Sequence, residues 1–186
     1  MPFRIIQVDS SRLTDFYQIS IAFEVRSIYD VFEKNGSIEL VERILDQPYT
    51  KDYDALDSNS FELWSKMNTS TWGIFLAIDE KPIGGAIVTM PDCALYDLRV
   101  ASAYRRSGVG RDLFQHALQW AKRQELTQCL SIETQNTNVS ACRFYAAMGA
   151  QLGDIDRNAY RDDEQVKDEI RLNWYIYFQQ YDRHEE

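Results

Sequence analysis

The feature that most constrains the fold is an uninterrupted strand, glycine loop and helix between residues 95 and 121. Side chains from Leu95 to Val100 alternate between two faces, which is the pattern of a β-strand. After the loop, apolar residues recur at helical spacing as Val109, Leu113, Phe114, Ala117, Leu118 and Ala121. The chain therefore passes directly from a strand into a helix through Arg105-Arg106-Ser107-Gly108-Val109-Gly110.

This loop is suited to binding a large anion. The first amides of a helix have no intrahelical partner, and the helix dipole makes that end slightly positive. Glycine lets the backbone bend, so that several N–H groups converge on one ligand. Arg105 and Arg106 add fixed positive charge. Together these properties predict a phosphate or pyrophosphate site.

Two common phosphate-binding fingerprints do not fit this loop. The dinucleotide fingerprint needs a third glycine where the chain has Leu113. The Walker A loop needs Gly-Lys-Ser/Thr, whereas Gly110 is followed by Arg111 and Asp112. The remaining pattern, R-x-x-G-x-G after a strand, resembles the coenzyme A pyrophosphate loop of the GNAT superfamily of N-acetyltransferases. An ordinary turn between strand and helix is the alternative interpretation.

A second stretch resembles the later GNAT signature, N-x-x-A-x-x-F/L-Y-x-x-x-G-F. It is present as Asn138, Ala141, Phe144, Tyr145 and Gly149. Asn138 is also a good N-cap for a helix, and Gly149 is a natural residue just after its end. The next position holds alanine where the family usually has phenylalanine, which weakens a packing contact and leaves the chemistry untouched. Two signatures in the family's order support the resemblance.

The remaining patterns predict a single α/β domain over residues 1–186. Further strands are expected at 3–8, 72–78, 83–90, 129–134, 152–160 and 170–178. The 129–134 strand should lie parallel to the 95–100 strand through a helical crossover. With the resemblance, this order predicts a GNAT-type mixed sheet, mostly antiparallel, with a central parallel pair and flanking helices.

The first third of the chain is harder to interpret. Helices are expected at 13–19, 20–32 and 38–45, the last ending before Pro48. Residues 48–54 read as an acidic and aromatic loop, and 61–67 as one more helix or a lid. The pair Gly84-Gly85 lies inside an expected strand and indicates a bulge or a close backbone approach.

The composition of the chain limits the kinds of molecule that it is expected to bind. The net charge of −9, from 20 basic and 29 acidic residues, argues against nucleic acid and suits a cationic ligand. The alternative is that this acidity only keeps the protein soluble. No apolar run is long enough to cross a membrane, and the start reads as a strand rather than a signal peptide. Three cysteines without a CxxC pair indicate reduced thiols in a cytoplasmic protein. Neither histidine has a partner at ligand spacing, so we expect no metal, and we expect a monomer or homodimer.

The resemblance implies acetyl-CoA as cosubstrate and assigns its contacts. These lie on the strand, on the loop and on the second helix: Leu98, Val100, Arg105, Arg106, Ser107, Gly108, Val109, Gly110, Arg111, Asn138, Ala141 and Tyr145. Tyr145 is the family's usual general acid, because a tyrosine with a pKa near ~10 stays protonated at neutral pH. The alternative is a tyrosine packed in the core.

Two carboxylates are candidates for the general base. The family often presents a carboxylate from the strand that holds Asp97, which would accept the amine's proton directly or through water. Asp97 could instead orient a cationic substrate, or pair with Arg99. Glu133 on the neighbouring strand is the competing carboxylate.

Within the superfamily, the chain resembles the streptothricin acetyltransferases. The resemblance rests on E-T-Q-N-x-N-x-x-A-C-x-F-Y from Glu133, on P-Y-x-K-D-Y-D from Pro48, and on the ending D-E-I with W-Y from Asp168. It implies a small cationic amine as acceptor, bound by Tyr49, Tyr53, Asp54, Asp97 and Glu133. Competing hypotheses are a polyamine, an aminoglycoside-like amine or a protein amine as acceptor, and a catalytically silent CoA-binding module.

Overall fold

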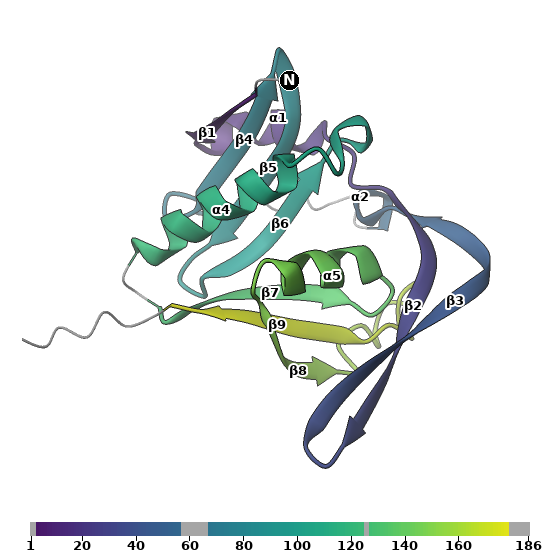
Figure 1. Ribbon diagram of the computed structural model, residues 1–186. Helices are drawn as coiled ribbons and strands as arrows, with labels where there is room; N and C mark the ends of the chain where they lie inside the picture. The colour runs from purple at the N-terminus through teal and green to yellow at the C-terminus, as the bar shows by residue number, and fades with distance from the viewer. Residues whose placement is uncertain (1–2, 57–66, 125–126, 179–186) are drawn as a thin grey trace, which may run out of the picture.

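The computed structural model describes residues 3–56, 67–124 and 127–178. A seven-stranded sheet in the order β1-β4-β5-β6-β7-β9-β8 forms its centre (Figure 1). The strands are β1 (Arg4–Val8), β4 (Gly73–Asp79), β5 (Lys81–Thr89), β6 (Ala94–Val100), β7 (Cys129–Gln135), β8 (Gln151–Asp156) and β9 (Arg171–Tyr177). Within the described residues β6 and β7 are parallel and the other neighbours are antiparallel, which confirms the predicted sheet.

The parallel pair meets over a short length. Ala94 pairs with Ser131 and Leu95 with Ile132, at the start of β6. Beyond these pairs the two strands separate toward their carboxyl ends. The sheet is thus divided into an N-terminal half and a C-terminal half, with an opening between them that Figure 1 shows below the start of α4.

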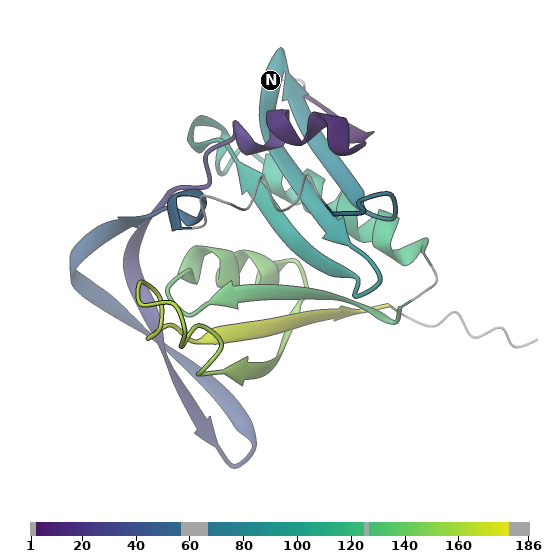
Figure 2. The same ribbon diagram turned by 180° about the vertical axis from the view of Figure 1, so that it is seen from behind.

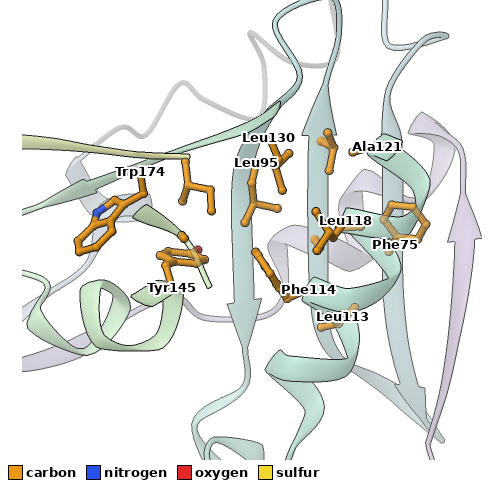
Figure 3. Close-up of a cluster of buried hydrophobic side chains, with 14 of the residues drawn as sticks. Phe75, Leu95, Leu113, Phe114, Leu118, Ala121, Leu130, Tyr145 and Trp174 are labelled. Carbon is orange, nitrogen blue, oxygen red and sulfur yellow. The ribbon is translucent and has the colours of Figure 1, made fainter. Parts of the chain in front are cut away.

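The helices cover the sheet on both faces. Helices α4 (Val109–Lys122) and α5 (Val139–Ala147) lie on one face (Figure 1), and the short α1 (Leu13–Tyr17), which follows the 3₁₀ turn η1 (Ser10–Arg12), lies on the other (Figure 2). The helical stripe predicted on α4 is fully buried against Phe75, Leu95 and Leu130 (Figure 3). Hydrophobic burial of this stripe holds α4, and with it the glycine loop, at the end of β6.

Two of the expected helices are wrong. Residues 23–32 and 38–45 belong instead to two long strands, β2 (Phe23–Lys34) and β3 (Ser37–Lys51), which pair as a separate two-stranded sheet, and residues 20–22 connect α1 to β2. Asn35 and Gly36 join them with φ of 52° and 78°, the left-handed geometry of a tight hairpin turn. An Asn-Gly pair between apolar runs was the available signal, and the i, i+3 spacing of isoleucine and valine on β3 concealed it.

The β2–β3 hairpin crosses the outer side of the C-terminal half and extends beyond β8 (Figures 1 and 2). It is tied to the loop after β7 by reciprocal hydrogen bonds, in which Tyr29 N donates to Asn136 O at 2.9 Å and Asn136 Nδ2 donates to Tyr29 O at 2.9 Å. Its second strand delivers Lys51, and then the single-turn α2 (Tyr53–Leu56), to the opening in the sheet. The loop expected at 48–54 is therefore the end of a strand followed by a helical turn.

Several other expectations are met. The β4–β5 hairpin is present, and its glycines are sites of close approach, since a Cβ on Gly85 would lie 2.5 Å from the ring of Phe16 and one on Gly84 2.8 Å from Leu113. The strand expected at 152–160 ends at Asp156. The helix or lid expected at 61–67 lies, except for residue 67, outside the described residues. In the parts of the chain that the structure describes, no helix is long and apolar enough to span a membrane.

Candidate active site

A cavity of about 1360 Å³ occupies the place where β6 and β7 separate. The glycine loop and the start of α4 form one end of it, and α5 lines the middle. The other end is formed by α2 and by the 157–170 segment between β8 and β9. One cavity therefore joins the loop predicted to bind pyrophosphate to the residues predicted to bind the acceptor.

The glycine loop has the backbone geometry that an anion site requires. Gly108 is the N-cap of α4 with φ of 98°, and Arg106 also has a positive φ of 65°. The first helical hydrogen bond is that from Asp112 N to Gly108 O at 3.1 Å, so the amides of the preceding residues have no partner within the helix. A Cβ on Gly108 would meet nothing within 4 Å, which leaves this side of the loop open. The loop therefore fits a pyrophosphate group.

The side chains of the loop are used differently. Arg105 Nε donates to Val100 O at 3.0 Å, and its Nη2 donates to Ala22 O at 2.8 Å. Ser107 Oγ donates to Tyr104 O at 2.6 Å, which stabilises the 3₁₀ turn η2 (Ser102–Tyr104). Backbone amides, rather than these two side chains, remain available to the anion.

Tyr145 is held by α5 at the middle of the cavity. Asn138 caps this helix, because its side-chain oxygen accepts from Ala141 N at 3.1 Å, as predicted. The ring of Tyr145 packs against Phe114 and Phe144 with centroids 5.9 and 5.2 Å away, at the edge of the core cluster (Figure 3). Burial raises the pKa of Tyr145, and the nearby charge of Asp97 raises it further. The phenol therefore stays protonated and able to donate.

Asp97 lies close to Tyr145 but is not a free carboxylate. Arg99 Nε contacts its two oxygens at 3.2 and 3.1 Å, and Nη2 makes an additional ion pair. Arg99 also binds Asp54, with Nη1–Oδ2 at 3.0 Å and Nη2–Oδ1 at 3.1 Å. Burial raises the pKa of Asp97, and Arg99 opposes that rise. Asp97 thus forms the salt bridge with Arg99 that the sequence analysis gave as an alternative, and Asp54 pairs with the same guanidinium.

Sequence reasoning considered Arg99 only as a partner of Asp97 and did not predict its contacts with α1 and α2. Its side chain is 2% exposed, and its guanidinium lies 4.7 Å from the ring centroid of Phe16 and 5.0 Å from that of Tyr17. It thereby neutralises part of the charge of two carboxylates while holding both toward the cavity. A polar residue inside an alternating strand was the available signal, but its second partner is 45 positions away in the sequence.

A second buried ion pair lies at the end of the cavity that α2 and the 157–170 segment form. Lys51 Nζ pairs with Glu169, lies 3.3 Å from Thr137 Oγ1 and sits 4.7 Å above the ring of Tyr53. Burial lowers the pKa of Lys51, and the carboxylate of Glu169 opposes that effect. The phenol of Tyr53 donates to Gln135. These contacts join β3, α2 and the segment before β9 into one wall.

Of the other two residues predicted to bind the acceptor, Glu133 lines the cavity and Tyr49 does not. Glu133 lines the cavity, and its Oε1 accepts from Tyr160 Oη at 2.6 Å, while its Oε2 lies 3.8 Å from Arg171. Tyr160 was expected at the end of the 152–160 strand and was not predicted to be a site residue; it lies instead in the segment between β8 and β9. Tyr49 is 44% exposed on β3 and is absent from the described residues that line the cavity. Tyr53, Asp54, Asp97 and Glu133 thus line one cavity, whereas Tyr49 lies near Glu169 but outside the cavity lining.

Charge is divided along the cavity. Arginines 105, 106 and 111 line the end formed by the glycine loop. The other end holds five carboxylates, from Asp54, Asp97, Glu133, Asp163 and Glu169, against Lys51 and Arg99. One end therefore suits an anion and the other a cation. In the parts of the chain that the structure describes, histidine, cysteine, aspartate and glutamate form no group of three or more placed to hold a metal ion.

Comparisons with known proteins agree with this geometry. A family model described as the acetyltransferase (GNAT) family matches residues 38–150. Streptothricin acetyltransferase from Escherichia coli is 33% identical over 156 residues, which cover 82% of this chain and 84% of that protein. Streptothricin acetyltransferase A from Bacillus subtilis (strain 168) is 32% identical over 151 residues, which cover 78% of this chain and 83% of that protein.

Solved structures have the same fold. A Bacillus anthracis str. Ames protein, described provisionally as a streptothricin acetyltransferase and solved with acetyl coenzyme A, matches with a TM-score of 0.78 and 25% identity. That match covers 95% of this chain and 100% of the other. A nourseothricin acetyltransferase matches with a TM-score of 0.76 and 21% identity over 95% of this chain and 99% of the other, which is a likeness of fold.

Proposed function

This chain belongs to the GNAT family of acetyl-CoA-dependent N-acetyltransferases, and we propose that it acetylates a primary amine of a small cationic acceptor, streptothricin. The observation that carries the proposal is the division of charge along one cavity, with the glycine loop and three arginines at one end and carboxylates at the other. Such a cavity suits the simultaneous binding of acetyl-CoA and a cationic amine. The reaction then proceeds in a ternary complex, without a covalent intermediate on the protein.

The cosubstrate is held mainly by the backbone. The amides from Arg106 to Arg111 bind the pyrophosphate, because they converge at the start of α4 and have no partner within the helix. Leu98 and Val100 on β6 and Ala141 on α5 line the channel beyond the loop. Asn138, which caps α5, lines the same channel. The acetyl thioester would supply the acyl group and a thiol leaving group.

Tyr145 supplies a proton to the departing sulfur. Nucleophilic attack by the amine forms the N–C bond, the C–S bond breaks, and the thiolate takes the phenolic proton. Tyr145 suits this role because burial raises its pKa and keeps the phenol protonated at neutral pH, so that a proton donor is present when the sulfur departs. The new amide nitrogen loses its extra proton to solvent, and solvent returns a proton to the tyrosinate, so that both groups end uncharged.

A carboxylate removes the proton that the ammonium must lose before it attacks. Asp97 is the first choice, directly or through a water molecule, because it lies near Tyr145 and because burial raises its pKa, which makes it a stronger base. Its contacts with Arg99 compete with this role. Glu133 is the alternative, since it lines the same cavity and has solvent on one side.

The acceptor is assigned from charge and from the relatives' names. Carboxylates of Asp54, Asp97 and Glu133 can pair with ammonium groups, and the ring of Tyr53 already carries the cation of Lys51 on its face. Two relatives at 33% and 32% identity are named for streptothricin. The amine of its β-lysine moiety is the proposed acceptor group.

The experiment is steady-state kinetics with streptothricin, spermidine, an aminoglycoside and a lysine peptide, at two salt concentrations. We expect the highest kcat/KM for streptothricin, and a lower value at higher salt because screening weakens cation attraction. Efficient turnover of another amine without acetylation of streptothricin would refute the acceptor and leave the acetyltransferase. Thiol release with none of the four amines would favour the silent CoA-binding alternative if acetyl-CoA still binds.

A further inference from the structure

Arg105, the first residue of the glycine loop, directs its guanidinium at three backbone carbonyls outside that loop. Nε donates to Val100 O at 3.0 Å, and Nη2 donates to Ala22 O at 2.8 Å and approaches Ser20 O at 3.5 Å. Val100 ends β6, whereas Ser20 and Ala22 lie between α1 and β2. One side chain therefore links the loop to a distant part of the chain.

The linked segment forms a wall of the cavity at the acceptor end. Ile21 and Phe23 both line the cavity, and the ring of Phe23 lies 5.7 Å from that of Tyr53. The residues between α1 and β2 have no ladder partners, so side chains must hold their backbone. Arg99 does this from the other side, because its Nη1 donates to Ile19 O at 3.2 Å.

The geometry suits arginine and not lysine. A planar guanidinium offers donors in several fixed directions, so that one side chain reaches both the end of β6 and the segment beside it. A lysine would keep the positive charge but would replace this fork with a single flexible ammonium. A role in attracting the pyrophosphate would survive that exchange far better than a role in holding two backbone segments.

We propose that Arg105 is a positioning residue for the acceptor wall at Ile21 and Phe23, and not a ligand of the CoA pyrophosphate. Arg105 fixes this wall to the glycine loop and to β6, and thereby holds the wall in a constant position relative to the loop. The inference rests on the proposed function in one respect, namely that the end of the cavity near Tyr53 binds the acceptor.

The test compares Arg105→Lys with the parent protein. The KM for the amine is measured at saturating acetyl-CoA, and the CoA dissociation constant is measured by calorimetry. We expect the amine KM to rise about tenfold, the loss expected for one charge-assisted hydrogen bond, with the CoA constant changed less than about twofold. A rise in the CoA constant alone, a parallel rise in both constants, or no change in either would overturn the proposal.

Two further variants keep the result interpretable. Ile21→Ala should raise the amine KM by itself, and the double variant should fall short of the sum of the two effects because both act on one wall. Additive effects would contradict the proposal. Arg123→Lys, at the exposed end of α4, is the matched control and should change neither constant. The amine used is whichever one the parent acetylates, so failure of streptothricin as acceptor would not be confused with failure of this inference.

Discussion

Arg99 and Asp97, two positions apart on β6, form an ion pair that is almost completely buried, with side chains 2% and 9% exposed. The same guanidinium binds Asp54 on α2. Burying these charges is tolerated because each is hydrogen-bonded to another. The pair therefore sets both the position of the candidate base and the charge that a cationic acceptor would encounter.

Replacement of Asp97 should show whether this residue accepts the proton of the amine or only binds the cationic acceptor. If Asp97 accepts the proton, Asp97→Asn should lower kcat/KM and remove the acidic limb of its pH profile. Because burial raises the pKa of Asp97, that limb should lie above the ordinary value of 3.8 in the parent, with activity falling as the pH drops through it. A loss confined to KM would instead assign Asp97 to cation binding, and an unchanged profile would favour Glu133 or water. Glu133→Gln provides the matched comparison.

Tyr145→Phe should lower kcat about a hundredfold while leaving the CoA dissociation constant nearly unchanged, because only the proton donor is lost. The ring contacts with Phe114 and Phe144 remain, so the melting temperature should stay close to that of the parent. Stopped-flow detection of thiol release measures the first effect and calorimetry the second. A kcat equal to that of the parent would make Tyr145 structural.

Gly108→Val should weaken CoA binding more than Ser107→Ala. Gly108 has φ of 98°, where a β-branched residue is strained, although a Cβ there meets no neighbour within 4 Å. Moving the loop out of that conformation costs about 1–2 kcal/mol, or roughly tenfold in affinity. Ser107 contributes only a side-chain hydrogen bond to Tyr104 O, and its φ is not positive, so alanine can take its place without backbone strain. Calorimetric titration with CoA compares them, and equal affinities would contradict the backbone explanation.

Gly85→Ala should destabilise the protein through packing. A Cβ on Gly85 would lie 2.5 Å from Phe16 and 3.1 Å from the backbone oxygen of Phe75. Overpacking of this kind costs about 1–3 kcal/mol, measured as the free energy of unfolding in urea. Gly36→Ala is the control, because its Cβ would meet nothing, so that any cost there comes from its positive φ alone. A stable Gly85→Ala variant would mean that Phe16 moves freely beneath β5.

Lys51→Met should destabilise the protein by about 3 kcal/mol, because it leaves Glu169 buried without its partner. Lys51→Met combined with Glu169→Leu should recover part of that loss, since neither charge then remains. Lys167→Met is the control, because Lys167 pairs with Glu164 on the surface and should contribute almost nothing. Equal effects of Lys51→Met and Lys167→Met in urea unfolding would refute a structural role for the buried pair.

The strand, glycine loop and helix from 94 to 122 could be predicted from sequence because local rules decide them. Side chains alternate on β6, apolar residues repeat on α4, and glycine permits the positive φ between them. The cap of α5 by Asn138 is equally local. The resemblance to the GNAT signatures used these same stretches, which is why the family and the sheet were correctly predicted.

Tertiary structure alone decided the rest, because the decisive partners are far apart in the chain. The spacing of apolar residues on β3 is compatible with a helix, and pairing with β2 across Asn35-Gly36 made it a strand. Arg99 finds Asp54, and Lys51 finds Glu169, only when α2, β3 and the segment before β9 converge on the opening between β6 and β7. Sequence patterns record the periodicity of single elements, whereas the charges that meet in the cavity depend on how those elements pack.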